Sequence, residues 1–230
     1  MDLSQRDEHL RELMDDPDCD PARLDATLRR FGIVNRLVAG WDVVYRTRMR
    51  RVLSSVDRPA RVLDIGSGGG DVLAHLARRA ERDQLNVQWT GVDPDPRAHA
   101  AAVSRQAPNI RFVCADAETL LAQGERFDVV ISNHVLHHLG AEELQDFTEA
   151  SLRLSTGPVL HSDIARSRLA YGLFAVGITP LAPGTFLRTD GLRSIRRSYR
   201  PAELAAALGD SWRVSTPSPF RVLAEGVGHG

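Results

Sequence analysis

From residue 60 onward, short apolar runs alternate with stretches in which apolar residues recur every three or four positions. Short apolar runs indicate buried strands, and the three-to-four spacing indicates amphipathic helices. A regular strand–helix order predicts a parallel sheet with helices on both faces. The expected strands are 61–65, 87–92, 110–114, 127–132 and 158–162, and the expected helices are 71–82, 95–106, 141–154 and 201–208. The fold class is therefore α/β, a doubly wound and mostly parallel sheet, which 212–216 and 220–224 complete as a last pair of strands.

The first 56 residues depart from this alternation because they show helical spacing without intervening strands. Apolar residues recur at helical spacing between Leu10 and Met14, and Asp20 followed by a proline is typical of a helix start. The apolar positions from 24 to 52 predict one or two further amphipathic helices. We therefore expect an N-terminal helical cap over 1–56.

The remainder, 57–230, is expected to form the core, with one interruption. Residues 164–199 break the strand–helix rhythm and contain several apolar and aromatic positions. A connection of this length inside a compact domain is usually functional. We expect it to cover the substrate.

The charge balance argues against a partner that is bound mainly through phosphates. The chain has 29 basic and 30 acidic residues, a formal net charge of −1, and every basic residue other than histidine is arginine. Nucleic-acid binding needs a basic excess, and Schiff-base chemistry needs a lysine, so both are disfavoured. We expect a small-molecule partner and no nucleic acid.

Cysteine content and hydropathy bear on the compartment. Cys19 and Cys114 are too few for a disulfide scaffold or a cysteine zinc site. No run approaches the roughly 18 apolar residues of a membrane span, and the acidic N-terminus does not resemble a secretory signal. We expect a cytoplasmic monomer or homodimer without a membrane span.

The strongest local signal is a glycine-rich turn after the first expected strand. Glycines stand at 66, 68, 69 and 70, and Asp71 follows them at the start of a helix. Glycine permits a positive φ and lets a ligand approach the backbone, next to the free N–H groups of the helix start. The spacing does not give the third glycine of a dinucleotide turn, and Asp71 is unfavourable for a pyrophosphate. It is acceptable for a ligand that carries an amine and a sulfonium, so a nicotinamide oxidoreductase is disfavoured.

Two further acids follow later strands. Asp93 lies 23 residues after Gly70, where an acid commonly binds ribose hydroxyls, and Asp116 ends the third strand, where an adenine edge would lie. Each acid alone is equally well explained as a helix cap or turn residue. Their order, with each acid at a strand end, favours a nucleoside site.

With these elements in place, the chain resembles class I S-adenosylmethionine-dependent methyltransferases over about residues 58–165. The matching elements are Asp64-Ile-Gly66-Ser-Gly68-Gly-Gly70, Asp93, Asp116-Ala117 and Phe127–Asn133. The run Ser132–Leu139 is similar to small-molecule enzymes of the ubiquinone/menaquinone methyltransferase type. The resemblance implies a Rossmann-like fold, S-adenosylmethionine as cofactor and S-adenosylhomocysteine as product. It is specific for the cofactor and uninformative about the acceptor.

The resemblance also implies roles for individual residues. Gly66, Gly68 and Asn133 would lie along the methionine part of the cofactor. Asp64 would support the amino group, often through water, while Asp93 would hold the ribose and Asp116 the adenine amine. The full set of expected cofactor residues is Asp64, Gly66, Ser67, Gly68, Gly70, Asp93, Pro94, Asp116, Ala117, Asn133 and His134.

Methyl transfer is an in-line displacement that requires a well-placed nucleophile in a dry pocket, and loss of the acceptor proton helps it. His137 and His138 follow the fourth strand and are the candidate general bases; backbone hydrogen bonding at a turn is the alternative role. The spacing of His134, His137 and His138 would permit a zinc site. We expect no metal, because no cysteine is near and the chemistry needs none. Magnesium of the catechol type is also disfavoured, because Asn133 takes the place of an acid.

The acceptor is the least determined part. Aromatic residues and strand-end polar residues are suited to bind it, and arginines near 193–197 are suited to pair with an anion. The expected substrate-binding residues are Trp41, Tyr45, His161, Asp163, Tyr171, Arg193 and Arg197. The chain lacks the Asn/Asp-Pro-Pro-aromatic turn of DNA amino-methyltransferases.

The sequence thus predicts methylation of a small hydroxyaromatic, quinol-like or polyketide metabolite, with oxygen slightly preferred over carbon as the methylated atom. Catalysis would proceed by histidine-assisted deprotonation or by proximity. The alternative is a non-catalytic cofactor-binding protein on a methyltransferase scaffold.

Overall fold

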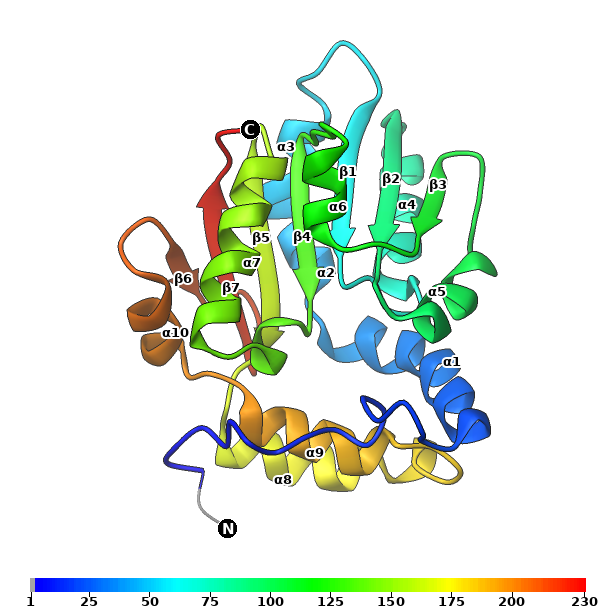
Figure 1. Ribbon diagram of the computed structural model, residues 1–230, viewed down its shortest axis with the longest axis vertical. Coiled ribbons are helices and arrows are strands. Elements are labelled where there is room, and N and C mark those ends of the chain that lie inside the picture. The colour runs from blue at the N-terminus through cyan, green and yellow to red at the C-terminus, as the bar shows by residue number, and fades with distance from the viewer. Residues whose placement is uncertain (1–2) are drawn as a thin grey trace.

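The computed structural model describes residues 3–230, apart from the side chain of Leu37, and is built around one sheet (Figure 1). The first two residues of the expected cap lie outside this range. The strands are β1 (Ala60–Ile65), β2 (Val87–Val92), β3 (Ile110–Val113), β4 (Val129–Asn133), β5 (Pro158–Ile164), β6 (Arg213–Ser215) and β7 (Arg221–Val227). The strand order is β3-β2-β1-β4-β5-β7-β6; the first five strands are parallel, and β7 runs antiparallel to both β5 and β6. The predicted doubly wound, mostly parallel fold is confirmed.

The strand order reverses between β1 and β4. From β1 the chain moves outward to β2 and β3, and it then returns to place β4 on the other side of β1. The connections diverge at this point and leave a crevice at the carboxyl ends of the two strands. Asp64 of β1 is in register with Ile131 of β4, so the glycine turn that follows β1 lies beside Asn133.

Helices cover both faces of the sheet. They are α1 (Pro21–Val38), α2 (Trp41–Val44), the π-helical turn η1 (Tyr45–Met49), α3 (Arg50–Leu53), α4 (Asp71–Arg82), α5 (Pro96–Val103), α6 (Ala117–Ala122), the 3₁₀ turn η2 (Leu136–His138), α7 (Ala141–Leu154), α8 (Arg168–Gly177), the 3₁₀ turn η3 (Thr179–Leu181), α9 (Leu187–Arg197) and α10 (Pro201–Leu208). Successive strand residues point to opposite faces, so Val62 packs with α4 and the neighbouring Leu63 with the α6–α7 side. Burial on both faces explains why the strands read as continuous apolar runs.

Helices α1, α8 and α9 lie across the carboxyl ends of the strands, at the bottom of Figure 1. Asp20 caps α1 by accepting from Ala22 N and Arg23 N, as the sequence predicts. The expected helix near Leu10–Met14 is absent, and that prediction is wrong. The segment 3–20 instead runs over α9, where the Asp190 carboxylate accepts from Leu13 N and Met14 N. Tertiary hydrogen bonds to α9 have replaced the local ones of a helix.

Two smaller features complete the fold. Helix α6 was not evident from the apolar pattern because it is only six residues long. Within the described residues, no helix is both long enough and apolar enough to cross a membrane.

Candidate active site

A cavity of about 640 Å³ lies at the carboxyl ends of β1 and β4, beneath α1, α8 and α9. The glycine turn lines one part of the cavity, and the turn that carries His137 and His138 lines another part. The apolar wall between them is Leu28, Phe31, Val34, Ile164, Leu173, Phe174, Ile178, Leu187, Ile195 and Phe220. A volume of this size and an apolar wall with a few polar groups are typical of small-molecule sites.

The glycine turn is held open by backbone hydrogen bonds. Gly66 N and Ser67 N both donate to Val92 O, and Gly68 N donates to the Asp93 carboxylate at 2.9 Å. Gly68 has a φ of +53°, and a Cβ built there would meet no atom within 4 Å. The turn therefore presents bare backbone to open space, which suits a ligand that lies directly against it.

Asp64, at the end of β1, is fully buried beside this turn, and its Oδ1 atom has no hydrogen-bond partner. Burial, reinforced by the nearby carboxylates of Asp71 and Asp93, raises the pKa of Asp64 well above its usual range. A buried polar atom without a partner is costly, and a ligand ammonium group would satisfy it. Three carboxylates around a glycine turn fit a cationic ligand and disfavour a pyrophosphate.

The expected ribose and adenine residues lie beyond the cavity, at the ends of β2 and β3. Asp93 accepts from Gly68 N and Asp95 N, and burial raises its pKa. Asp116 is exposed and caps α6 by accepting from Thr119 N and Oγ1. Gly70 closes the glycine turn, Pro94 follows Asp93, and Ala117 begins α6. None of these five residues lines the cavity itself; they lie at the strand ends next to the glycine turn.

Asn133 and His134 line the cavity and share a partner that the sequence did not reveal. Arg221, at the start of β7, is 2 % exposed and donates to Asn133 Oδ1 and to His134 Nε2 at 2.9 and 2.8 Å. Trp41 Nε1 also donates to Asn133 Oδ1. Burial, and next the Arg221 guanidinium, lower the pKa of His134 well below its usual range. His134 is therefore a neutral acceptor, and a buried guanidinium faces the cavity at this point.

His137 does not fit the expected role of general base. It is 1 % exposed, its Nδ1 atom lies 2.8 Å from Asp163, and its Nε2 atom lies 3.1 Å from Glu12. Burial opposes its charge, but the two carboxylates outweigh burial and raise the pKa of His137 to about 9. An imidazole with both nitrogens engaged and its proton held this firmly is poorly suited to accept another proton.

His138 is more accessible, with 30 % of its side chain exposed. Its Nδ1 atom lies 3.3 Å from Asp15, and its Nε2 atom lies 3.8 Å from Glu12. The His137 and His138 rings lie side by side with centroids 4.2 Å apart. Both imidazoles therefore turn one nitrogen toward the same carboxylate.

Glu12 is the residue that the sequence reading missed most completely. It is 5 % exposed, and it enters the cavity from the N-terminal segment and accepts from Ser194 Oγ of α9 at 2.7 Å. Burial raises its pKa, but the hydrogen bond with His137 and the charges of both histidines outweigh burial and lower it. The acid-rich N-terminus was visible in the sequence, yet nothing local linked it to histidines 125 residues away.

The structure does not bring the seven expected acceptor residues to the cavity wall. Tyr45 donates to Asp83, and Arg193 donates to Arg11 O at the surface. Three others contact polar groups of the site: Trp41 contacts Asn133, Asp163 contacts His137, and Arg197 contacts His138. Tyr171 lies on α8, and His161 is buried on β5, an interior strand of the sheet. The apolar faces of α1, α8 and α9 form the wall instead. These helices are amphipathic, and they turn their apolar faces inward where they cover the ends of the strands.

His161 carries a pH prediction of its own. It is fully buried between Phe147 and Trp212, and burial lowers its pKa from 6.5 to about 3. The unfolded chain thus takes up a proton first as the pH falls, so the stability contribution is complete above pH 6.5 and declines toward pH 3. In that window His161 should make the unfolding free energy fall by about 1.4 kcal/mol for each unit of decrease in pH. We expect the His161→Gln variant to lack this part of the pH dependence. Urea unfolding of both proteins at several pH values checks this, and parallel curves would contradict it.

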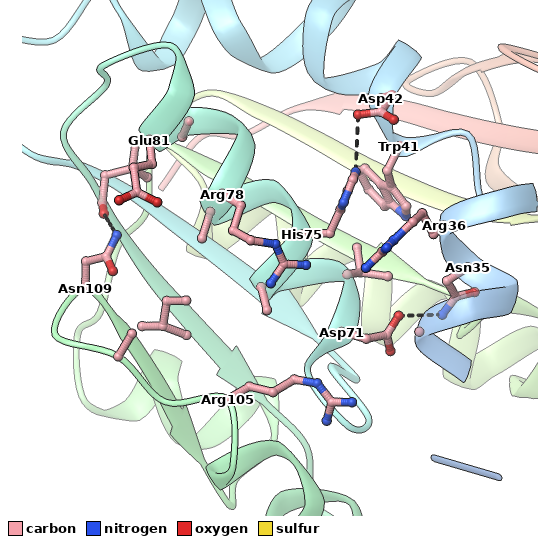
Figure 2. A pocket seen from close by; sticks show the side chains of 18 of the residues that line it. Asn35, Arg36, Trp41, Asp42, Asp71, His75, Arg78, Glu81, Arg105 and Asn109 are labelled. Atoms are coloured by element: carbon pink, nitrogen blue, oxygen red, sulfur yellow. Dashed lines mark hydrogen bonds and ion pairs between the residues drawn. The ribbon is translucent and has the colours of Figure 1, made fainter. Parts of the chain in front are cut away.

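A second hollow of about 1210 Å³ lies behind the glycine turn, between α1, α2 and α4 (Figure 2). Arg36, Arg78 and Arg105 point into it together with Asp71, whose carboxylate accepts from Asn35 Nδ2 at 3.0 Å. Its lining is an open mixture of charges and does not include His137 or His138. We place the chemistry in the smaller cavity, which joins the glycine turn to the histidines.

This sheet order, with a glycine turn beside buried acids at the end of β1, is typical of class I S-adenosylmethionine-dependent methyltransferases. Residues 62–156 match the family described as "Methyltransferase domain". S-adenosylmethionine is accordingly its cofactor.

A curated relative, the ubiquinone biosynthesis O-methyltransferase of Brucella anthropi, is 29 % identical over 154 residues, which cover 64 % of this chain and 57 % of the relative. The chain thus spans somewhat more than half the length of that relative. The plantazolicin methyltransferase BpumL, solved in complex with SAH, has a TM-score of 0.60 at 13 % identity and covers 90 % of this chain and 96 % of its own. The CurJ carbon methyltransferase has a TM-score of 0.64 at 15 % identity, covering 93 % and 62 %. At these identities, the two structures establish the shared fold.

Proposed function

We propose that the protein transfers a methyl group from S-adenosylmethionine to an oxygen atom of a small hydroxyaromatic, quinol-like or polyketide metabolite. The observation that carries the proposal is the continuous cavity of about 640 Å³. One end is a glycine turn suited to a cationic cofactor. The other part is an apolar chamber that reaches Glu12, His137 and His138.

The cofactor half of the proposal assigns roles to residues at the strand ends. Gly66 and Gly68 would lie against the methionine part, and the partnerless Oδ1 atom of Asp64 would receive the amino group. Asp93 would hold the ribose and Asp116 the adenine amine. When bound, the cofactor supplies a methyl group already activated on a sulfonium, so these residues need only bind and orient it.

The part of the proposal that concerns the methyl acceptor rests on two features of the cavity, its apolar wall and its polar cluster. Aromatic and aliphatic side chains such as Phe31 and Phe174 would hold a flat apolar body and exclude water. His138 and Glu12 would orient a hydroxyl group, and His138 would assist the loss of its proton. A polar cluster of this kind favours an oxygen nucleophile, and the curated relative is named as an O-methyltransferase.

The test is a methylation assay with isotopically labelled cofactor and a panel of catechols, quinols and phenolic polyketides. Products that carry the label as a methyl ether support the proposal. Label on carbon would overturn the oxygen assignment. Cofactor binding without any labelled product would favour a non-catalytic binding protein on the same scaffold.

The Asp93→Ala change is expected to weaken binding of S-adenosylhomocysteine by about 1–3 kcal/mol, because hydrogen bonds to an ionised group would be lost. Asp93 also accepts from Gly68 N, so the glycine turn would loosen together with the ribose contact. Calorimetric titration measures the change. Asp146→Ala, at an exposed position of α7, is the matched control, and equal affinities of the two variants would refute the ribose role.

A further inference from the structure

The cluster at Glu12 has the arrangement of a metal site. Glu12 Oε1 lies 3.1 Å from His137 Nε2 and 3.8 Å from His138 Nε2, and each of the three residues offers one ligand atom within 4.8 Å of the other two. We propose that Glu12, His137 and His138 bind one divalent transition-metal ion, with zinc as the best match, whose open coordination position faces the cavity.

The spacing and the donor types agree with zinc. Nitrogen and oxygen ligands at about 2.0–2.2 Å from a tetrahedral ion lie about 3.3–3.5 Å from each other. The observed separations of 3.1 and 3.8 Å lie on either side of that value, so small side-chain rotations would complete the site. Two histidines and one glutamate are also a donor set of catalytic zinc sites, which keep a fourth position open.

The Nδ1 atoms of His137 and His138, which face away from Glu12, give a second, independent observation. His137 Nδ1 lies 2.8 Å from the Asp163 carboxylate, and His138 Nδ1 lies 3.3 Å from that of Asp15. Metal-binding histidines almost always donate their other N–H to such a partner, which fixes the tautomer and leaves the inner nitrogen free to coordinate. A simple buried ion pair would account for His137 with its two carboxylates. It would not account for a second imidazole, with its own carboxylate behind it, turned toward the same oxygen.

A neighbouring trio is a weaker alternative. His134, His137 and Asp163 also place their ligand atoms within 4.8 Å of one another. The guanidinium of Arg221 lies 2.8 Å from His134 Nε2, where it occupies the lone pair and repels a cation. Beside the Glu12 cluster, Arg197 faces Asp15 at 3.6 Å and donates to His138 O, and Arg6 donates to His137 O, so both guanidinium groups engage oxygen atoms other than those of Glu12.

The catalytic role of this site rests on the proposed function, whereas metal binding does not. A hydroxyl bound at the open position would lose its proton to water more readily, as metal-bound hydroxyls do. Its oxygen would then form a bond to the cofactor methyl carbon as the carbon–sulfur bond breaks, giving a methyl ether and S-adenosylhomocysteine. The histidines would act as ligands. The sequence-based expectation of no metal considered only the local histidine triplet, without Glu12.

The experiment uses the full chain without a polyhistidine tag, stripped with a chelator and then titrated with Zn²⁺ and Co²⁺. We expect one ion per chain and a visible Co²⁺ spectrum typical of a low-coordinate nitrogen–oxygen site. Glu12→Gln and His138→Gln should each weaken binding by at least about 100-fold. Asp163→Asn, which keeps the shape of the side chain and removes the charge behind His137, should weaken it by about 10–100-fold. Glu8→Gln and His9→Gln, exposed on the same segment, are controls that should bind as the unmodified protein does.

The outcomes separate the two proposals. One tight ion that the Glu12 and His138 variants lose supports the site, even if no phenol in the panel is methylated; that failure would count against the proposed function alone. Zn²⁺ binding no tighter than in His138→Gln, with methylation insensitive to chelator, would overturn the site and leave the proposed function standing. The Co²⁺ spectrum of the unmodified protein requires no variant to fold.

Discussion

A Gly68→Val variant is expected to lose affinity for S-adenosylhomocysteine by more than about 100-fold, equivalent to roughly 3 kcal/mol. The Cβ position at Gly68 meets no protein atom within 4 Å, so the valine side chain would extend into the space that we assign to the cofactor. Gly68 also has a φ of +53°, which a β-branched residue rarely adopts. A backbone shift there would break the Gly68 N–H hydrogen bond to Asp93.

Gly124→Val is a close control for this change. Gly124 also has a positive φ, +70°, with no atom within 4 Å of a Cβ, but it lies in the loop before β4, away from the cavity. Both variants should lose a similar amount of stability from backbone strain, about 1–2 kcal/mol. Calorimetric titration should show normal cofactor affinity only in the control. If Gly68→Val also binds normally, the glycine turn is not the cofactor site.

Most of the core was predictable because its signals are local. The helix 71–82 and the strand 87–92 have the bounds that the apolar spacing indicates. Strands such as β4 are buried on both faces, so their sequence contains a run of consecutive apolar residues, Val129–Ile131 in β4, that is difficult to misread. The glycine turn was equally visible, since its function depends on consecutive residues with little side chain.

The N-terminal segment shows why the remaining structure was not predictable. The residues around Leu10–Met14 have helical spacing, yet their backbone hydrogen bonds go to Asp190 of α9. Whether this segment forms a helix depends on a partner about 176 residues away, which no local pattern encodes. The position of Glu12 in the cavity follows from the same contacts.

The candidate site was therefore only half accessible from sequence. The cofactor end could be found because each acid lies at the end of a strand or within a few residues after it. The other part depends on three distant segments, which carry Glu12, the His137–His138 turn and Ser194 of α9. Arg221 was missed for the same reason, because it reaches Asn133 and His134 from the antiparallel strand β7.

The His138→Ala change is expected to lower kcat by about 10²–10⁴, the usual range for loss of a group that assists proton removal, with little change in cofactor affinity. His138 lies at the polar part of the cavity, while the glycine turn lies at the other end. Its side chain is 30 % exposed, so alanine leaves little buried void and the fold should persist. Turnover is measured with an acceptor from the phenol panel, and cofactor affinity by calorimetry.

The comparison with His137→Ala shows why His138 is the better probe. His137 lies between Glu12 and Asp163, all three at most 5 % exposed, so its removal leaves two buried carboxylates without their partner. Breaking a buried pair in this way costs about 3–5 kcal/mol, so that variant would lose stability along with turnover. His229→Ala, at an exposed position near the C-terminus, serves as the neutral control for His138→Ala. Full activity in a folded His138→Ala variant would mean that proximity alone drives the transfer. The cavity wall would then be sufficient to hold the acceptor for reaction, without help from the histidines.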